Sequence, residues 1–438
     1  MHLFSYRNGA LRCEDVDLTR VAEKFGTPTY VYSAETIRDH YTRLDAALAR
    51  LDHLICYAVK ANSNRAILKL LADAGAGFDI VAGGELFRVL AAAPAGAGAK
   101  CTFAGVGKSR EEIEYALEQR VYSFNVESES ELEQIDRVSG SKKMRAPIAL
   151  RVNPDVDPHT HEYISTGSRE NKFGIAVDQV QSVYERAAKM RNIDIVGVQM
   201  HIGSQITQAA PFASAIKKVA PVVRELKSKY GIKFFSVGGG MGIVYRRALE
   251  SGSGKWWHDR GGEPSAFSVR DYADAIVPPL RELDIRILVE PGRFLVGNAG
   301  VLLTRVRYIK KSGAKKFAIV DAGMNDLIRP ALYHSCHEVV PVEEAKSERE
   351  RKISKIDIVG PVCESGDFFA LDREMPELHE GDLLAIMSAG AYGFVMASNY
   401  NSRPLPAETL VRGDKVELIR RRQTWEDLVR EEVEANPL

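Results

Sequence analysis

Short apolar runs recur along the first two-thirds of the chain, each bounded by polar residues or by glycine and proline. Runs of this length and composition are typical of buried β-strands. Amphipathic stretches separate them, and before the first run Ile37, Tyr41, Leu44, Leu48 and Leu51 recur at spacings of three and four, which predicts one helical face. The predicted strands are His53–Val59, Phe78–Val81, Cys101–Ala104, Val121–Val126, Pro147–Val152, Ile195–His201, Lys233–Val237 and Arg286–Glu290.

Helix-start signals fall between these strands. Ser109-x-x-Glu112 and Ser128-x-x-Glu131 each have the spacing of a capping box, which predicts that a helix begins there. The alanine- and glycine-rich stretch Ala91–Ala99 is predicted to be a loop. Eight strands with helices between them predict an α/β fold, a (β/α)8 TIM barrel.

The pattern changes after about residue 297. The chain becomes rich in strands and turns, and few segments keep a helical period, which predicts a separate C-terminal all-β domain. The expected division is a barrel over 34–297 and a β domain over 298–438, with 1–33 joining the β domain. The strands predicted there are Val301–Tyr308, Lys316–Asp321, Ser354–Val359 and Asp382–Met387, and a short helix is predicted over Trp425–Val433.

Polar residues collect where the predicted barrel strands end. Barrels of this kind carry their active sites at the carboxyl ends of the strands, so these residues are the candidates for chemistry. They are Lys60 after the first strand, Asp79 in the second, Asn125 and Glu127 at the fourth, Arg151 and Asn153 at the fifth, His201 at the sixth, Gly238-Gly239-Gly240 after the seventh, and Glu290 and Arg293 at the eighth.

Each of these side chains suits a cofactor that carries an aldehyde, a phosphate and a ring nitrogen. A lysine at the end of a buried strand would have a lowered pKa and a nucleophilic amine, which a Schiff base requires; a surface lysine is the alternative for Lys60. Glu290 could keep a ring nitrogen protonated, or could pair with Arg293. The three glycines could admit a phosphate, or form a tight turn. His201 could stack on a flat ring, or be a structural residue.

Composition narrows the choice of ligand. Lys plus Arg and Asp plus Glu both total 59, so nothing favours nucleic acid or a membrane surface, and a small substrate is expected. Five widely spaced cysteines argue against disulfides or a structural zinc site, and His159 and His161 lack a third ligand, so no metal is expected. The start of the sequence has no secretory apolar region, which favours a cytoplasmic location.

Several motifs, in order along nearly the whole chain, identify a resemblance. They are Tyr57-Ala58-Val59-Lys60-Ala61-Asn62, Asn171-Lys172-Phe173-Gly174-Ile175, His201-Ile202-Gly203-Ser204-Gln205, Gly238-Gly239-Gly240, Glu290-Pro291-Gly292-Arg293, Cys363-Glu364-Ser365-Gly366-Asp367, Ser388-Ala389-Gly390-Ala391-Tyr392-Gly393 and Asn399-Tyr400-Asn401-Ser402-Arg403-Pro404. The chain resembles the pyridoxal-phosphate decarboxylases of the alanine-racemase fold (fold type III). Within them it looks like the members that convert meso-2,6-diaminopimelate to L-lysine and CO2, the last step of bacterial lysine synthesis.

The resemblance implies a role for each position. Lys60 would hold the cofactor covalently and Glu290 would face its ring nitrogen. The remaining cofactor contacts would come from Asp79, Arg151 and His201 around the ring, from Ser204, Gly238, Gly239 and Gly240 at the phosphate, and from Gly292, Arg293 and Tyr392.

The resemblance also implies a second binding site, for the distal end of the substrate. Arg293, Arg329 and Tyr333 would bind the distal carboxylate, while Glu364 would bind the distal ammonium, with Tyr392 nearby. An ornithine-type relative needs no distal carboxylate site, so Arg329 and Tyr333 favour diaminopimelate; a surface ion pair is the alternative for Arg329.

The partner chain of a homodimer would supply Cys363 and Glu364, with Cys363 as the acid that returns a proton to the α-carbon. As a lone residue, Cys363 would be core packing.

Three other functions compete. A decarboxylase for another basic amino acid or a polyamine precursor would share most of these motifs. A protein that holds the cofactor without chemistry would resemble the barrel alone, and a racemase would need a second base. One segment, Ser251–Gly262, is longer and more aromatic than is expected for the family, because it contains Trp256-Trp257-His258. An interface or a lid is the expected role of such a segment.

Overall fold

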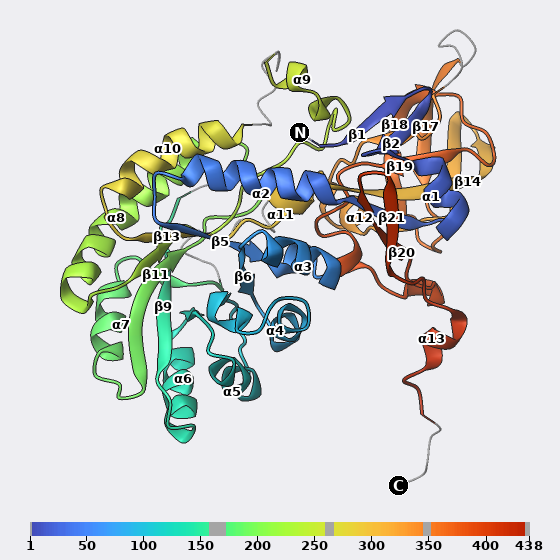
Figure 1. The fold of residues 1–438 in the computed structure, drawn as a ribbon. Coiled ribbons are helices and arrows are strands. Elements are labelled where there is room, and N and C mark those ends of the chain that lie inside the picture. The colour runs from blue at the N-terminus through green and yellow to red at the C-terminus, as the bar shows by residue number, and fades with distance from the viewer. Residues whose placement is uncertain (1, 157–171, 259–266, 345–351, 434–438) are drawn as a thin grey trace. The chain divides into compact units, whose positions relative to one another are not determined.

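The computed structural model describes residues 2–156, 172–258, 267–344 and 352–433 (Figure 1). Two compact units are present. One comprises Met1–Ile37, Val244–Gly261 and Val296–Leu438, and the other comprises Arg38–Ile243 and Gly262–Leu295. His159, His161 and Asn171 lie outside the described residues.

The second unit is a closed parallel barrel. Its strands hydrogen-bond in the order β9-β11-β12-β13-β5-β6-β7-β8, and pairing of β8 with β9 closes the ring. The predicted (β/α)8 barrel is therefore confirmed, and each predicted strand is present with ends shifted by a few residues. The strands are β5 His53–Ala58, β6 Gly77–Ile80, β7 Cys101–Phe103, β8 Ser123–Val126, β9 Ala146–Asn153, β11 Ile193–Met200, β12 Phe234–Ser236 and β13 Arg286–Val289, and the short β10 Ile175–Ala176 pairs with β9.

Helices follow the strands and lie on the outside of the barrel (Figure 1). Helix α2 (Ala34–Leu48) buries Ile37, Tyr41, Leu44 and Leu48, which belong to the face that the sequence spacing predicts. The other helices around the barrel are α3 Arg65–Asp73, α4 Gly83–Leu90, α5 Arg110–Glu118, α6 Glu129–Ser141, α7 Val180–Ala187, α8 Ala210–Tyr230, α10 Val269–Arg281 and the short α11 Arg293–Val296. Among the described helices, none combines the length and the apolar character needed to cross a bilayer.

The two predicted capping boxes have different outcomes. At α5 the box is complete, because the Ser109 hydroxyl accepts from the Glu112 N–H and the Glu112 carboxylate accepts from the Ser109 N–H. At α6 only the Ser128 half forms. The Glu131 carboxylate instead accepts from the Glu127 N–H and from the Lys108 ammonium, so the box prediction is wrong for its second half.

The other unit is built on mixed, mainly antiparallel sheets around the long strand β14. This strand pairs with β15, β19 and β4, and β4 also pairs in parallel with β20. All five residues of β4 are buried, so the opening part of the chain belongs to the interior of this unit. The strands are β4 Thr29–Ser33, β14 Gly300–Ser312, β15 Lys315–Val320, β16 Val339–Pro341, β17 Ile353–Val359, β18 Phe368–Pro376, β19 Leu383–Ile386, β20 Ala407–Arg412 and β21 Lys415–Arg420, with β1 Phe4–Arg7, β2 Ala10–Cys13 and β3 Val16–Asp17 in a smaller sheet.

The segment 244–261 joins this unit, although the sequence boundaries place it in the barrel. The Ala248 carbonyl lies 2.6 Å from His2 Nε2, and the Leu249 N–H donates to Glu338 over 2.8 Å. Trp256 is buried and meets Trp257 edge-to-face, with ring centroids 4.9 Å apart. The aromatic residues of this unusual segment therefore serve local packing.

Candidate active site

Five candidate side chains come from five different barrel strands and lie at their carboxyl ends. Lys60 lies in the short turn η1 Val59–Ala61 directly after β5, and Asp79 lies in β6. Arg151 is near the end of β9, and His201 and Glu290 directly follow β11 and β13. Parallel strands of a closed barrel end on one rim, so the fold brings these residues to the same edge.

Lys60 is exposed, whereas Val59 and Ala61 on either side of it are buried. The prediction of a buried amine is therefore wrong. The strand ends one residue earlier than expected, and the turn directs Lys60 out of the core. Its charge still acts on the rim, because it lowers the pKa of both Asp79 and Glu290 against the opposing effect of burial.

Glu290 is a buried carboxylate held by neutral donors. The Ser236 hydroxyl donates to one oxygen over 2.6 Å, and the Gln199 amide donates to the other over 3.0 Å. Burial raises the pKa of Glu290, while these two hydrogen bonds oppose the rise. Burying a carboxylate against neutral donors is costly, which is typical of a group that binds a cationic ligand.

Asp79 lies two strands away and is also buried. Burial and the neighbouring Glu290 raise its pKa well above the usual range. The Thr102 hydroxyl donates to Asp79 over 3.3 Å. Because Glu290 receives the shorter hydrogen bonds, it is the better placed of the two to stay ionised.

His201 is half-buried, and its Nδ1 accepts from the Gly239 N–H over 3.2 Å. Burial, followed by the positive charges of Arg151 and Lys60, lowers the pKa of His201 well below its usual value. The imidazole is therefore neutral at pH 7, with Nδ1 as the acceptor. A flat neutral ring suits stacking on another ring.

The glycine loop has no room for side chains. A Cβ on Gly239 would lie 2.2 Å from the Glu290 carbonyl oxygen, and Gly240 has a φ of +113° that favours glycine. The loop is joined to the segment after His201, because the Ile206 N–H donates to the Gly240 carbonyl over 2.9 Å. Two loops are thus held together with their backbones close to the rim, as binding of a phosphate requires.

Arg293 and Ser204 lie together beside these loops. Arg293 is buried and donates to the Ser204 hydroxyl over 3.0 Å. A Cβ on Gly292 would lie 3.0 Å from the Cβ of Ala61, so this glycine lets the Arg293 segment pack against the Lys60 turn.

The remaining candidates belong to the β unit. Arg329 is buried, donates to His337 Nε2 over 3.3 Å, and lies over the rings of Tyr245 and Tyr333 at 5.2 and 5.7 Å. The surface ion pair considered from sequence does not describe this residue. Tyr392 is half-buried and has a φ of +55°, a conformation that is uncommon outside glycine and often found at functional sites.

Cys363 and Glu364 are both exposed within this chain. Core packing, the alternative given for Cys363 as a lone residue, therefore does not describe it within this chain. Cys363 lies in the turn between β17 and β18, where its N–H donates to Asn401 over 2.8 Å.

Two residues that hold the site were missed from sequence, and a third was a candidate without an assigned role. Ser236 and Gln199 bind Glu290, and Glu127, noted only for its position, forms a buried ion pair with Arg151 over 3.0 Å. Ser236 and Gln199 lie in strands β12 and β11. Because the side chains of a strand point alternately to its two faces, their positions could have marked them as polar residues directed into the barrel.

Comparisons with known proteins agree with this geometry. Residues 34–297 match the family described as pyridoxal-dependent decarboxylase, pyridoxal binding domain. The chain is similar to diaminopimelate decarboxylase of Pseudomonas aeruginosa, with 50% identity over 429 residues that cover 98% of each protein. It is also 45% identical to diaminopimelate decarboxylase of Aquifex aeolicus over 425 residues, 97% of this chain and 96% of that protein.

Solved structures give the same result. Diaminopimelate decarboxylase from Helicobacter pylori, complexed with L-lysine, matches 94% of this chain and 98% of its own at a TM-score of 0.86 and 41% identity. The enzyme from M. jannaschii, in complex with L-lysine, matches 98% of this chain and 97% of its own at a TM-score of 0.88 and 36% identity. The chain therefore belongs to the family of pyridoxal-phosphate-dependent amino-acid decarboxylases.

The residues present fit pyridoxal phosphate. The glycine loop offers backbone N–H groups where a Cβ could not fit, Glu290 supplies a buried anion for a protonated ring nitrogen, and Lys60 presents an amine at the rim. His201 supplies a neutral ring next to the glycine loop.

Proposed function

We propose that this chain removes one carboxylate from meso-2,6-diaminopimelate and yields L-lysine and CO2. The observation that carries the proposal is the buried Glu290 carboxylate, held by two neutral donors beside a glycine loop at the barrel rim. The full-length similarity to diaminopimelate decarboxylases supports the choice of substrate. Bound pyridoxal phosphate supplies an electron sink for the pair of electrons that the leaving CO2 donates.

The barrel residues hold and tune the cofactor. Lys60 would hold it through the side-chain amine, and Glu290 would keep the ring nitrogen protonated, because Ser236 and Gln199 hold the carboxylate in place. His201 would stack on the ring as a neutral imidazole. The glycine loop and Ser204 would bind the phosphate, and the resemblance assigns the remaining cofactor contacts to Asp79, Arg151, Gly292 and Arg293.

The residues of the β unit determine the substrate specificity. Arg329 carries a permanent charge over two tyrosine rings, which limits its rotation and suits it to bind a carboxylate. The resemblance assigns the distal carboxylate to Arg293, Arg329 and Tyr333. The resemblance assigns the distal ammonium to Glu364 and a cofactor contact to Tyr392.

Two copies of the chain share their active sites. Cys363 and Glu364 come from the partner subunit, and the Cys363 thiol is the acid that delivers a proton to the α-carbon after CO2 leaves. Their exposure within one chain supports this assignment, because a residue that serves a neighbouring copy must be accessible.

The decisive experiment mixes pure protein, pyridoxal phosphate and meso-diaminopimelate, and measures CO2 and lysine. Lysine, ornithine and arginine as alternative substrates test the rival decarboxylases, and recovery of an epimerised substrate without CO2 would indicate a racemase. Absence of CO2 from every substrate, with cofactor bound, would reject the proposal.

Shared sites have a test of their own. Lys60→Ala and Cys363→Ala should each be inactive alone. After the subunits are mixed and re-associated at random, about a quarter of the wild-type sites should be intact, because half of the dimers are mixed and each holds one undamaged site. No recovery in a re-associated dimer would assign Cys363 to its own chain's site.

A further inference from the structure

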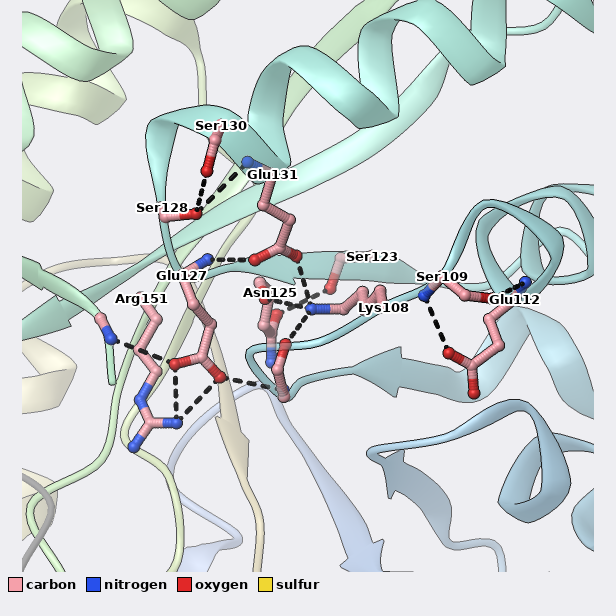
Figure 2. A network of polar contacts seen from close by, with 12 residues as sticks. Lys108, Ser109, Glu112, Ser123, Asn125, Glu127, Ser128, Ser130, Glu131 and Arg151 are labelled. Carbon is pink, nitrogen blue, oxygen red and sulfur yellow. Dashed lines mark hydrogen bonds and ion pairs between the residues drawn. The ribbon is translucent and has the colours of Figure 1, made fainter. Parts of the chain in front are cut away.

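Four charged side chains form a buried network at the barrel rim (Figure 2). They are Lys108, Glu131, Glu127 and Arg151, and their side chains are 0, 8, 1 and 7% exposed. Taking four charges out of water is costly, and hydrophobic residues often stabilise a core better. Such a network is therefore expected where an exact arrangement of the charges matters.

The Glu127 carboxylate is the centre of the network. One oxygen accepts from the Gly105 N–H over 2.9 Å, and the other accepts from the Gly174 N–H over 3.1 Å. Nη1 of Arg151 donates to both oxygens, over 3.0 and 3.1 Å. One side chain therefore ties together the loop after β7, the segment before β10 and the arginine at the end of β9.

Lys108 and Glu131 fix the backbone that carries Glu127. The Lys108 ammonium has three acceptors, namely the Gly105 carbonyl at 2.7 Å, the Asn125 carbonyl at 3.0 Å and the Glu131 carboxylate at 2.6 Å. The second Glu131 oxygen accepts from the Glu127 N–H over 3.0 Å. All three protons of this ammonium are used, which compensates its burial.

Arg151 is clamped from two sides. Its guanidinium lies 4.7 Å from the centroid of the Phe173 ring, and Glu127 holds Nη1. Gly174, next to Phe173, has a φ of +69°, and a Cβ there would lie 2.6 Å from Asn153 Oδ1. Phe173 and Gly174 belong to the Asn171–Ile175 motif, whose purpose the reaction alone does not explain.

The guanidinium of Arg151 also holds a buried donor, Nε, that Glu127 does not reach. Within the described residues, its buried Nε has no hydrogen-bond partner. Arg151 as a whole is 6% exposed, so water has little access to this N–H. A fixed, buried and unsatisfied donor at the rim points to an acceptor oxygen on the bound cofactor or substrate.

We propose that Glu127 is a positioning residue for the active site: it locks Arg151 against Phe173 so that the Arg151 Nε–H meets an acceptor oxygen of the bound ligand. This rests on the proposed function only in placing Arg151 at the cofactor. Both Glu127 oxygens already accept hydrogen bonds from backbone N–H groups and from Arg151, so Glu127 acts through Arg151.

The test compares Glu127→Gln with Glu129→Gln in the intact chain. A glutamine in place of Glu127 would keep the size of the side chain but offer one acceptor oxygen, and its NH2 would face a backbone N–H. Glu129 is two residues away, 51% exposed and paired with Arg186, so its variant is the matched control.

The first measurement is amide hydrogen exchange of the cofactor-free protein. Peptides that contain Gly105 or Gly174 should exchange at least about tenfold faster in Glu127→Gln, while the peptide with the separate Ser109–Glu112 cap stays unchanged. Unchanged exchange at both glycines would overturn the proposal. Because no catalysis is needed, this outcome is independent of which substrate the enzyme uses.

The second measurement is the dissociation constant for pyridoxal phosphate, by absorbance titration. It should rise at least about tenfold in Glu127→Gln and stay unchanged in the control. If Glu127→Gln does not fold, Phe173→Leu replaces it, because that change removes the ring beneath Arg151 and leaves the carboxylate intact. Wild-type affinity in the folded variant would refute a positioning role.

Discussion

The Glu290→Gln variant separates charge from shape at the centre of the site. Glu290 accepts hydrogen bonds from two neutral groups, the Ser236 hydroxyl at 2.6 Å and the Gln199 amide at 3.0 Å. Within the described residues the Gln199 Oε1 has no hydrogen-bond partner. Rotation of the Gln199 amide by half a turn would therefore let it accept from a new amide at position 290.

The size of the effect follows from this compensation. The fold should be nearly unaffected, with a change in the free energy of unfolding below about 1 kcal/mol, because every hydrogen bond is replaced and a buried charge is removed. The reaction should lose about 3 kcal/mol of transition-state stabilisation, a factor of about a hundred in kcat, because a neutral amide does not keep the ring nitrogen protonated.

The assay measures CO2 release at saturating substrate, with cofactor content from absorbance and stability from urea unfolding. Glu282→Gln is the control, because Glu282 is 71% exposed and pairs at the surface with Arg224. Turnover like that of the wild type, at full cofactor occupancy, would show that the ring nitrogen is not tuned by Glu290. Loss of the fold would refute the compensation by Gln199.

Other variants test the rest of the site. Lys60→Ala should abolish turnover, and borohydride treatment of the cofactor-loaded variant should leave no label on the peptide of residue 60; a label elsewhere in the wild type would exclude Lys60. Arg329→Ala should raise the KM for diaminopimelate at least about tenfold while CD spectra stay unchanged, and an unchanged KM would exclude the distal-carboxylate role. Burial raises the pKa of Asp326 to about 7 from 3.8, so the folded protein keeps a proton that the unfolded chain releases, and stability should fall by up to about 4 kcal/mol as pH rises between these values. Asp326→Asn should flatten that slope in urea unfolding measured across this pH range, and an unchanged slope would mean that Asp326 does not cause it.

The barrel could be predicted because its strands are short and buried, and the polar residues that interrupt the apolar pattern lie where strands end. Those two signals are local in sequence, so they identified Lys60, His201 and Glu290 together. The family motifs added the residues of the β unit.

The sequence could not predict the hydrogen-bond and ion-pair partners of the site residues. Glu127 accepts a hydrogen bond from the Gly174 N–H, 47 residues away in sequence. Its own N–H donates to Glu131, which also binds Lys108. No spacing rule in the sequence links these residues. The capping-box prediction for Glu131 failed for the same reason, because a buried ammonium from another loop competes for the carboxylate. The exposure of Lys60 depended on whether the strand ends at Val59 or at Ala58. A hydrophobic pattern does not locate the end of a strand to within one residue.

The position of strand β4 determines the order in which part of this sheet can form during synthesis. The strand lies in the sheet between β14 and β20, which begins at Ala407, near the other end of the chain. A ribosome adding about 5 to 20 residues each second releases β20 roughly 20 to 75 s after β4. During that interval the opening strand, with five residues destined for the interior, has an unpaired edge, so protection of nascent chains by a chaperone should matter most for the first 33 residues.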